Sequence, residues 1–377
     1  MRKTVGVSNI EKLFFELVQI ALGSKKPFSH KPTEKEWQQV FDLSLKQSVA
    51  GIVFETIRAM DADGTRPPFE MLMEWIATTE QIEGQNRLIN KNAVALVAMF
   101  KEEGFDSCLL KGQGNTLLYP NLYARTPGDI DLWITPNDKS LSEKDREKLV
   151  LKFLRKKYPT GFLHYNHIDG GTYNGTEVEV HHRPRFMNNM IHNARMQKWI
   201  AFKLEEQFAH YIRLPETDTD IAIPTWEFNA VFQLAHIYGH VLQSGIGLKH
   251  IIDYYYLLRS DERGKKEDVY KALRYLGLGK IAEAVMWVLH EKLGLEEEYL
   301  IAPMDEERGK VLLGEILRGG NLGQFDENNR KATTAIKKNI QRLKRDLRFV
   351  REYPAEALSE PIFRTWHFFW RICHRDF

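Results

Sequence analysis

Residues 128–134 read Gly-Asp-Ile-Asp-Leu-Trp-Ile, a pattern typical of a buried strand that carries two acids. Because side chains alternate between the two faces of a strand, Asp129 and Asp131 are expected on the same face. Two unpaired carboxylates in that position would repel each other and would be costly to remove from water. A hard divalent cation relieves both costs, and Mg²⁺ commonly binds one or two protein carboxylates together with phosphate oxygens. The pattern therefore predicts that Asp129 and Asp131 bind Mg²⁺ or Mn²⁺.

An apolar strand is expected just upstream, at residues 105–110, and it leads into Lys111, Gly112 and Gly114. We expect a helix to begin at Asn115. A glycine-containing turn at a helix N-terminus offers backbone N–H groups to an anion, and a lysine adds a point charge. This turn is therefore predicted to bind phosphate beside the predicted metal site.

A third carboxylate is expected on a later strand, where residues 176–183 read Thr-Glu-Val-Glu-Val-His-His-Arg. Strict alternation places both glutamates and the first histidine on one face and the two valines on the other. Asn174-Gly175 is a strong hairpin signal, so this strand is predicted to pair with an earlier one at about residues 163–168. A hairpin strand of this kind can bring an acid beside Asp129 and Asp131.

Two glutamates on that face compete for the role of third metal ligand. Val178 and Val180 flank Glu179 on both sides, whereas Thr176 leaves Glu177 the more exposed of the two. We therefore predict that Glu179 is the third acid of the site.

The order of these elements resembles that of the DNA polymerase β-type nucleotidyltransferase superfamily, and in particular its uncharacterised bacterial branch. The residues that carry the resemblance are Leu110-Lys111-Gly112, Tyr119-Pro120, Arg125, Gly128 to Leu132, Glu179-Val180-His181, His236, His240 and Asp253. The resemblance spans roughly residues 10–290 and implies nucleotidyl transfer, with Arg125 and His181 as further candidates for phosphate contacts by position. Two features depart from the superfamily. Lys111-Gly112 stands where it has Gly-Gly or Gly-Ser, and the gap from Gly112 to Asp129 is somewhat long.

The chain is predicted to have an α+β fold, with a small mixed-sheet core between two helical regions. Residues 1–100 are expected to be helical, residues 101–215 to form the nucleotidyltransferase core, and residues 216–377 to form a second helical region with a basic and aromatic tail. Apolar periodicity predicts a long helix over 69–103, and a charged helix is expected over 142–157.

A polar stripe on the helix expected at 226–244 consists of Asn229, Gln233, His236, His240 and Gln243, and Lys249 and Asp253 repeat the spacing on the next helix. These faces are either solvated or satisfied inside the core, or they close over the substrate pocket. The second interpretation predicts a pocket lid, which we define as Gln233, His236, His240, Lys249 and Asp253. His236 and His240 also have zinc-ligand spacing, but the glutamate of His-Glu-x-x-His is missing, so zinc is disfavoured.

Composition favours a cytoplasmic protein. Apolar residues make up 43% and charged residues 28% of the chain, values ordinary for a soluble protein. A net charge of +2 gives no argument for nucleic-acid binding by bulk electrostatics. No apolar run approaches the ~20 residues of a membrane span, and the N-terminus lacks the apolar region of a signal peptide. The two cysteines are far apart in the sequence and indicate a reducing compartment.

The C-terminal part, residues 330–377, combines basic and aromatic residues. Residues 330–351 carry many lysines and arginines against a single acid, Asp346. The aromatic residues of the tail are Trp366, Phe368, Phe369 and Trp370. The segment is either a solvated helix face followed by a docking segment, or a contact for anionic lipid or a polyanion.

We predict a Mg²⁺-dependent nucleotidyltransferase that moves a nucleoside monophosphate from a nucleoside triphosphate to an unidentified hydroxyl or phosphate acceptor. Asp129, Asp131 and Glu179 would be its catalytic metal ligands, and Lys111 would hold the leaving phosphates. One alternative is a catalytically idle nucleotide sensor on the same fold. Another is a helical adaptor without nucleotide chemistry.

Overall fold

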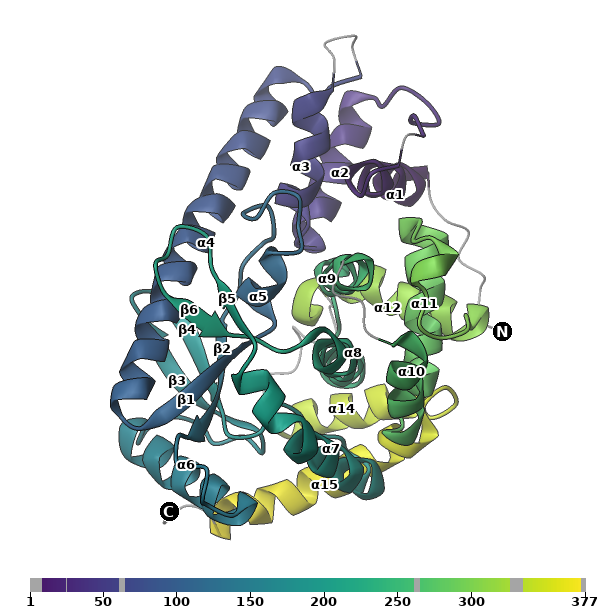
Figure 1. Cartoon of the computed structure of the whole chain (residues 1–377). Coiled ribbons are helices and arrows are strands. Elements are labelled where there is room, and N and C mark those ends of the chain that lie inside the picture. Colours follow the sequence, from purple (N-terminus) through teal and green to yellow (C-terminus); the bar gives the residue numbers. More distant parts are fainter. Residues whose placement is uncertain (1–8, 25, 61–64, 261–264, 326–334, 374–377) are drawn as a thin grey trace.

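The computed structural model describes residues 9–24, 26–60, 65–260, 265–325 and 335–373, and it has the predicted α+β architecture (Figure 1). The strands are β1 (Phe105–Leu110), β2 (Ile130–Pro136), β3 (His167–Tyr173), β4 (Thr176–His181), β5 (Tyr211–Arg213) and β6 (Asp220–Ala222). They form one mixed sheet in the order β3-β4-β2-β1-β6-β5. β1 and β2 pair antiparallel, whereas β2 and β4 pair parallel, and this places the two acid-bearing strands side by side at the centre.

Helices precede, interrupt and follow the sheet. The N-terminal helices are α1 (Asn9–Ala21), α2 (Glu34–Lys46), α3 (Ala50–Ala59) and α4 (Phe69–Glu102), and those within the sheet region are α5 (Gly112–Thr116), α6 (Glu143–Lys157) and α7 (Met190–Phe208). The C-terminal helices are α8 (Trp226–Gln243), α9 (Leu248–Arg259), α10 (Lys266–Tyr275), α11 (Gly279–Leu293), α12 (Glu306–Gly319), α14 (Ala335–Phe349) and α15 (Pro354–Cys373), with 3₁₀ turns at Glu297–Tyr299 and Asn321–Gly323. The long helix α4 and the charged helix α6 confirm their predicted ranges.

The hairpin before β4 is confirmed, but its first strand lies later in the chain than predicted. β3 covers His167–Tyr173, so it shares only residues 167 and 168 with the predicted range 163–168, and Leu163 forms an isolated bridge to Ile168. Asn174 and Gly175 have φ values of 45° and 79°, the left-handed pair that a two-residue hairpin turn requires. The glycines at residues 170 and 171 have low strand propensity, and this explains why the sequence pattern did not predict the second half of the strand.

The two faces of the sheet serve different purposes. Ile130, Leu132 and Ile134 of β2 pack with Val178 and Val180 of β4 in an apolar core that α4 and α6 cover. The opposite face carries the acids and is turned toward α7 and α8 (Figure 1). There Trp133 stacks on Phe228 of α8, with ring centroids 5.8 Å apart. The alternation of side chains along the strands thus gives the sheet one apolar, buried face and one face that carries the acids, which we call the chemical face.

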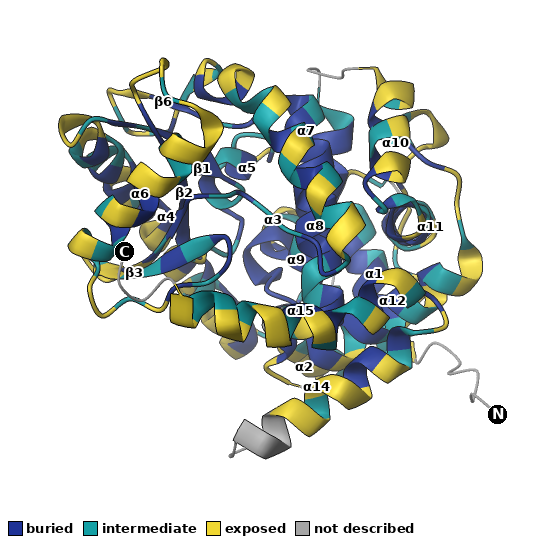
Figure 2. Cartoon of the chain, turned by 90° about the horizontal axis from the view of Figure 1, so that it is seen from below, coloured by how far each residue is buried: buried dark blue, intermediate teal, exposed yellow. Residues whose placement is uncertain are grey.

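The two helical regions share one apolar core, which includes residues of α1 to α3 and of α8 to α12. Figure 2 shows α8 as a largely buried helix in the middle of this arrangement. α2 is joined to the C-terminal helices by Gln47, which donates to the carbonyl of Ile316 at 2.9 Å and accepts from the N–H of Leu248 at 2.9 Å. The division at residues 100 and 215 remains a proposal, and β6 belongs to the sheet although it lies beyond residue 215.

Candidate active site

Three carboxylates meet at the chemical face of β2 and β4. Asp131 and Glu179 are direct partners in the parallel ladder, and Asp129 lies two residues before Asp131 on the same face. Carboxylate oxygens of the three residues lie within 4.8 Å of one another. Asp131 is only 1% exposed, whereas Asp129 and Glu179 are half-buried. Clustered hard oxygen donors, partly open to a cleft, fit the preference of Mg²⁺ or Mn²⁺.

Two cations from neighbouring elements compensate Asp131. Lys111 Nζ and His181 Nε2 each lie 2.9 Å from Asp131 Oδ1. Burial alone would lower the pKa of both groups, but the surrounding carboxylates outweigh it. The charge of Asp131 raises the pKa of Lys111 above its usual value, and hydrogen bonds to Asp131 and Glu179 raise the pKa of His181 to about 9. At neutral pH both groups are therefore positively charged.

The geometry of β4 distinguishes the two glutamates that could be the third acid of the site. Glu179 faces Asp131 in the ladder, whereas Glu177 is exposed near the hairpin turn. His181 Nε2 and His167 Nε2 lie 3.5 and 3.6 Å from the Glu179 oxygens. Despite the opposing effect of burial, these two imidazoles and Lys111 hold the pKa of Glu179 below its ordinary value. Glu179 is thus an anion at neutral pH.

The glycine-containing turn differs in detail from its prediction. α5 begins at Gly112 rather than Asn115 and has only five residues. Lys111 has a φ of 39°, in the left-handed region that side chains rarely adopt, and Gly112 follows with a φ of 45°. Gly114 is packed against Ile223, and a side chain added there would touch it at 3.4 Å. The predicted role of this turn in phosphate binding stays a proposal.

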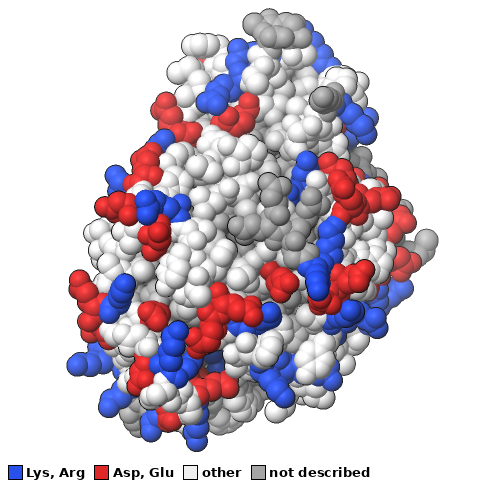
Figure 3. Space-filling model, in the orientation of Figure 1, with Lys and Arg blue, Asp and Glu red and all other residues white. Residues whose placement is uncertain are grey.

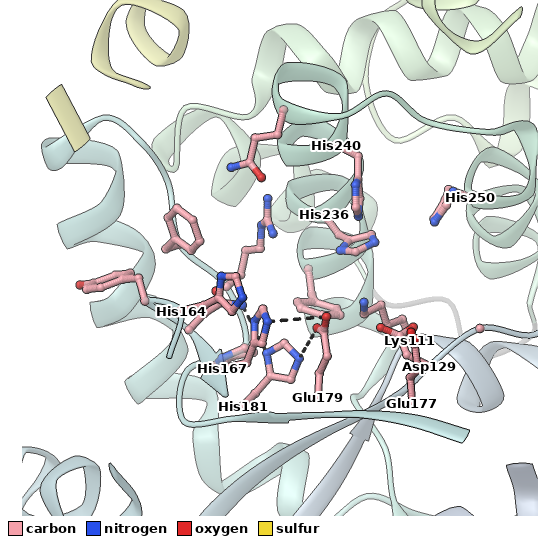
Figure 4. A pocket seen from close by; sticks show the side chains of 18 of the residues that line it. Lys111, Asp129, His164, His167, Glu177, Glu179, His181, His236, His240 and His250 are labelled. Atoms are coloured by element: carbon pink, nitrogen blue, oxygen red, sulfur yellow. Dashed lines mark hydrogen bonds and ion pairs between the residues drawn. The ribbon is translucent and has the colours of Figure 1, made fainter. Parts of the chain in front are cut away.

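A cleft of about 960 Å³ opens over the acids (Figure 4). Lys111, Asp129 and Glu179 line one wall, and His236 and His240 project from α8 on the opposite side. A smaller cavity of about 40 Å³ adjoins it at Asp129 and Asp131 and is also lined by Gln233, Lys249 and Asp253. The structure thus places the pocket lid beside the acids, although more than a hundred residues separate the two in the sequence.

Members of the lid have different surroundings. Gln233 Nε2 donates to Asn115 Oδ1 at 2.9 Å and so connects α8 to α5. Burial lowers the pKa of His236 well below its usual value and that of His240 to about 3, so both imidazoles are neutral at pH 7. His250, absent from the predicted set, lies near them, with ring centroids 5.6 Å from His236 and 5.7 Å from His240. Among the described residues, no group with metal-ligand geometry includes these histidines.

Arg125 and Asp253 form an internal ion pair. Arg125 Nε and Nη2 donate to the two oxygens of Asp253 at 2.7 and 2.9 Å. Tyr119 Oη donates to the same carboxylate at 2.6 Å, and all three residues are buried. The predicted phosphate contact of Arg125 would therefore compete with its ion pair to Asp253, which joins α9 to the loop before β2.

Sequence patterns missed the histidines on the other side of Glu179. His164, His167 and Asp169 bring ligand atoms within 4.8 Å of one another, and His167 pairs with His181 in the β3–β4 register. The signal was the spacing His-x-x-His-x-Asp at residues 164–169, which the misplaced strand concealed.

The basic C-terminal segment is partly internal. Residues 330–334 and 374–377 lie outside the described part, but Arg345 is buried and donates to the carbonyl of Val241 at 2.8 Å. In the aromatic tail, Trp366 and Trp370 of α15 pack on Tyr165, whereas Phe368 and Phe369 are exposed. Figure 3 shows basic and acidic side chains interspersed on the face in view. The contact with anionic lipid or a polyanion remains a proposal.

Comparison with known proteins supports the class of fold and chemistry. Residues 33–294 match the family described as uncharacterised nucleotidyltransferase, and the chain belongs to this family. No curated protein matches the sequence. The crystal structure of an antigenic nucleotidyltransferase-like protein from Paracoccidioides brasiliensis is similar at 15% identity and a TM-score of 0.32, over 57% of this chain and 93% of that chain. At this level the similarity carries no argument about the site. Within the described residues, no helix combines the length and apolarity needed to cross a membrane.

Proposed function

We propose that the protein is a Mg²⁺-dependent nucleotidyltransferase that moves a nucleoside monophosphate from a nucleoside triphosphate to a hydroxyl or phosphate acceptor. The observation that carries the proposal is the parallel pairing of Asp131 with Glu179, which gathers three carboxylates where the cleft meets the small adjoining cavity. Membership of the family supports transfer chemistry in general.

The chain's residues would position and neutralise groups rather than form covalent bonds. Asp129, Asp131 and Glu179 would hold the cation, which when bound neutralises phosphate charge and favours loss of the acceptor's proton. As the acceptor oxygen bonds to the α-phosphorus, the bond to the β-phosphate oxygen breaks and pyrophosphate leaves. Lys111 would bind that leaving group. The lowered pKa of Glu179 makes it a weak base, so we assign it primarily the role of a ligand.

A thermal-shift panel of nucleoside triphosphates tests this proposal. Because a ligand that binds only the folded state raises the melting temperature, one or more triphosphates should do so with Mg²⁺ or Mn²⁺ and much less in EDTA. Nucleoside diphosphates and monophosphates provide matched comparisons. Absence of any metal-dependent shift across the panel would contradict the proposal.

A nucleotide sensor without turnover is the second candidate. The observation that favours it is the double compensation of Asp131 by Lys111 and His181, which neutralises this carboxylate without a metal ion. A sensor predicts nucleotide binding that does not depend on Mg²⁺. The same panel therefore separates the two candidates.

A further inference from the structure

Arg185 is a cation on the cleft wall that the proposed chemistry does not use. It lies in the segment between β4 and α7 and lines the same cleft as Glu179, His236 and His240. Its side chain is half-buried, and its Nε is sealed from solvent without a hydrogen-bond acceptor. A charged group in such a position is expected to have a counterion.

The acids around Arg185 are already engaged elsewhere. Glu356 and Glu179 are the carboxylates whose charges act on it. Glu356 accepts from the N–H of Asn188 at 2.7 Å and contacts His192 Nδ1 at 2.8 Å. Glu179 contacts His167 and His181. Within the described ranges, no carboxylate forms an ion pair with Arg185, so its guanidinium is available to an anion in the cleft.

Helix α8 is shaped to receive this guanidinium. At Gly239, a Cβ atom would overlap Nη2 of Arg185, so the arginine lies directly against the helix backbone. Glycine inside a helix is unfavourable relative to alanine, and close packing of the arginine offsets that cost. Gly239 stands between His236 and His240 in the sequence, and the charge of Arg185 acts on both imidazoles.

The electrostatics of this wall suit a phosphoryl group. Burial lowers the pKa of Arg185 to about 10, which leaves it charged at neutral pH. The charges of both Lys111 and Arg185 act on His236 and His240, so the two neutral imidazoles lie within reach of two cations. A planar guanidinium binds phosphate oxygens through two parallel hydrogen bonds, and a neutral imidazole can add another.

We propose that Arg185 binds a phosphoryl group of a substrate in the cleft. Close packing against Gly239 positions its guanidinium for this contact. The substrate class is a phosphorylated molecule, and the group is either a phosphate of the acceptor or the terminal phosphate of the nucleotide. The assignment rests on the proposed function in one respect: the bound molecule is a substrate because the protein is proposed to be a nucleotidyltransferase. Phosphate binding itself requires neither the metal ligands nor turnover.

Calorimetric titration of the full chain with inorganic phosphate in EDTA tests the proposal. The wild type should bind phosphate saturably, and Arg185→Gln should weaken binding at least about tenfold, the scale of one charge-assisted hydrogen-bonding group. Arg213→Gln is the matched control, because Arg213 is an exposed arginine whose side chain pairs with Asp220. Phosphate binding that is absent in the wild type, or equal in Arg185→Gln, would overturn the assignment.

A second variant displaces the guanidinium without removing it. Gly239→Ala should also weaken phosphate binding, because the new methyl group occupies the position of Nη2. Gly314→Ala in α12 is its control, since a Cβ there meets nothing within 4 Å. Circular dichroism establishes that each variant is folded. Gly239→Ala with unchanged phosphate affinity would contradict the packing argument.

Two further arms separate the sources of the phosphoryl group. If phosphate still binds through Arg185 when Mg²⁺ and a non-hydrolysable triphosphate analogue saturate the site, the group belongs to the acceptor. If the analogue excludes phosphate and Arg185→Gln weakens analogue binding, the group belongs to the nucleotide. Asp131→Asn should lose metal-dependent nucleotide binding but keep phosphate binding. A chain that binds phosphate through Arg185 but no nucleotide would contradict only the proposed function.

Discussion

Arg125 and Asp253 lie 128 positions apart in the sequence, yet their guanidinium and carboxylate form two parallel hydrogen bonds at 2.7 and 2.9 Å. The pair connects α9 with the loop that leads to the acid-bearing strand β2. The pair therefore links the C-terminal helical region to the sheet at the candidate active site.

Breaking this pair should strongly destabilise the fold. Asp253→Ala leaves Arg125 buried without its counterion, and we expect the free energy of unfolding to fall by about 3–5 kcal/mol. Urea denaturation measures the change. Asp220→Ala is the control, because its pair with Arg213 is exposed and should contribute at most about 1 kcal/mol. Equal effects of the two substitutions would contradict this interpretation.

Asp131→Asn should remove metal dependence while the fold persists. The substitution takes away the most buried of the three charges, so Mg²⁺-dependent nucleotide binding should weaken and turnover should fall by at least roughly 10²-fold. The melting-temperature shift with triphosphate, measured with and without Mg²⁺, is the readout. Exposed Asp138 offers the comparison Asp138→Asn. If the metal dependence of Asp131→Asn equals that of the wild type, the metal site is wrongly assigned.

The two glutamates of β4 provide an internal comparison. Glu179→Gln should abolish transfer and largely spare nucleotide binding, because it removes a charge opposite Asp131 but keeps the shape of the side chain. Glu177→Gln should retain activity, since Glu177 is exposed near the turn. Consumption of triphosphate measures both. An inactive Glu177→Gln with an active Glu179→Gln would reverse the assignment.

Replacing His236 or His240 with alanine should raise the Michaelis constant for nucleotide or acceptor. Both imidazoles line the cleft opposite the acids, so their loss removes contacts to the ligand. The free energy of unfolding should fall by no more than about 1–2 kcal/mol. His290→Ala on α11 serves as a remote control. Unchanged Michaelis constants in both variants would show that these histidines serve packing alone.

Lys249 should make the stability of the folded state increase as the pH rises from 7 toward 10.5. Burial lowers its pKa from 10.5 to about 7, and Arg125 acts in the same direction. The folded state thus favours the neutral amine, and the contribution of Lys249 to stability is present above the unfolded pKa near 10.5 and is lost as the pH falls toward 7. Lys249→Met should therefore raise the melting temperature at pH 7, with the gain shrinking toward pH 10. Exposed Lys310→Met is the control, and a gain that does not vary with pH would contradict the assignment.

Local patterns were sufficient to predict the acid-bearing strands, because alternation on a strand is set by neighbouring residues. Asp129, Asp131 and Glu179 could be brought together from that pattern, the hairpin signal and the family resemblance. The ion pair between Arg125 and Asp253 could not be predicted, because an isolated arginine or aspartate in a sequence is as compatible with an exposed position as with a buried one. β5 and β6, at three residues each, are too short to show a period. His250 and Arg185 face the cleft through tertiary packing that no spacing records.

The left-handed backbone of Lys111 has a consequence for engineering the protein. A residue with a side chain at a φ of 39° is strained by roughly 1 kcal/mol or more, and glycine would relax that strain. Lys111→Gly would restore the Gly-Gly pair of the wider superfamily but would leave Asp131 with His181 as its one remaining cationic partner among the described ion pairs. At this position, relief of backbone strain and retention of a buried ion pair therefore make opposite demands on stability. Because removing one partner of a buried pair costs about 3–5 kcal/mol, selection for heat tolerance is expected to keep the lysine in spite of its strained backbone.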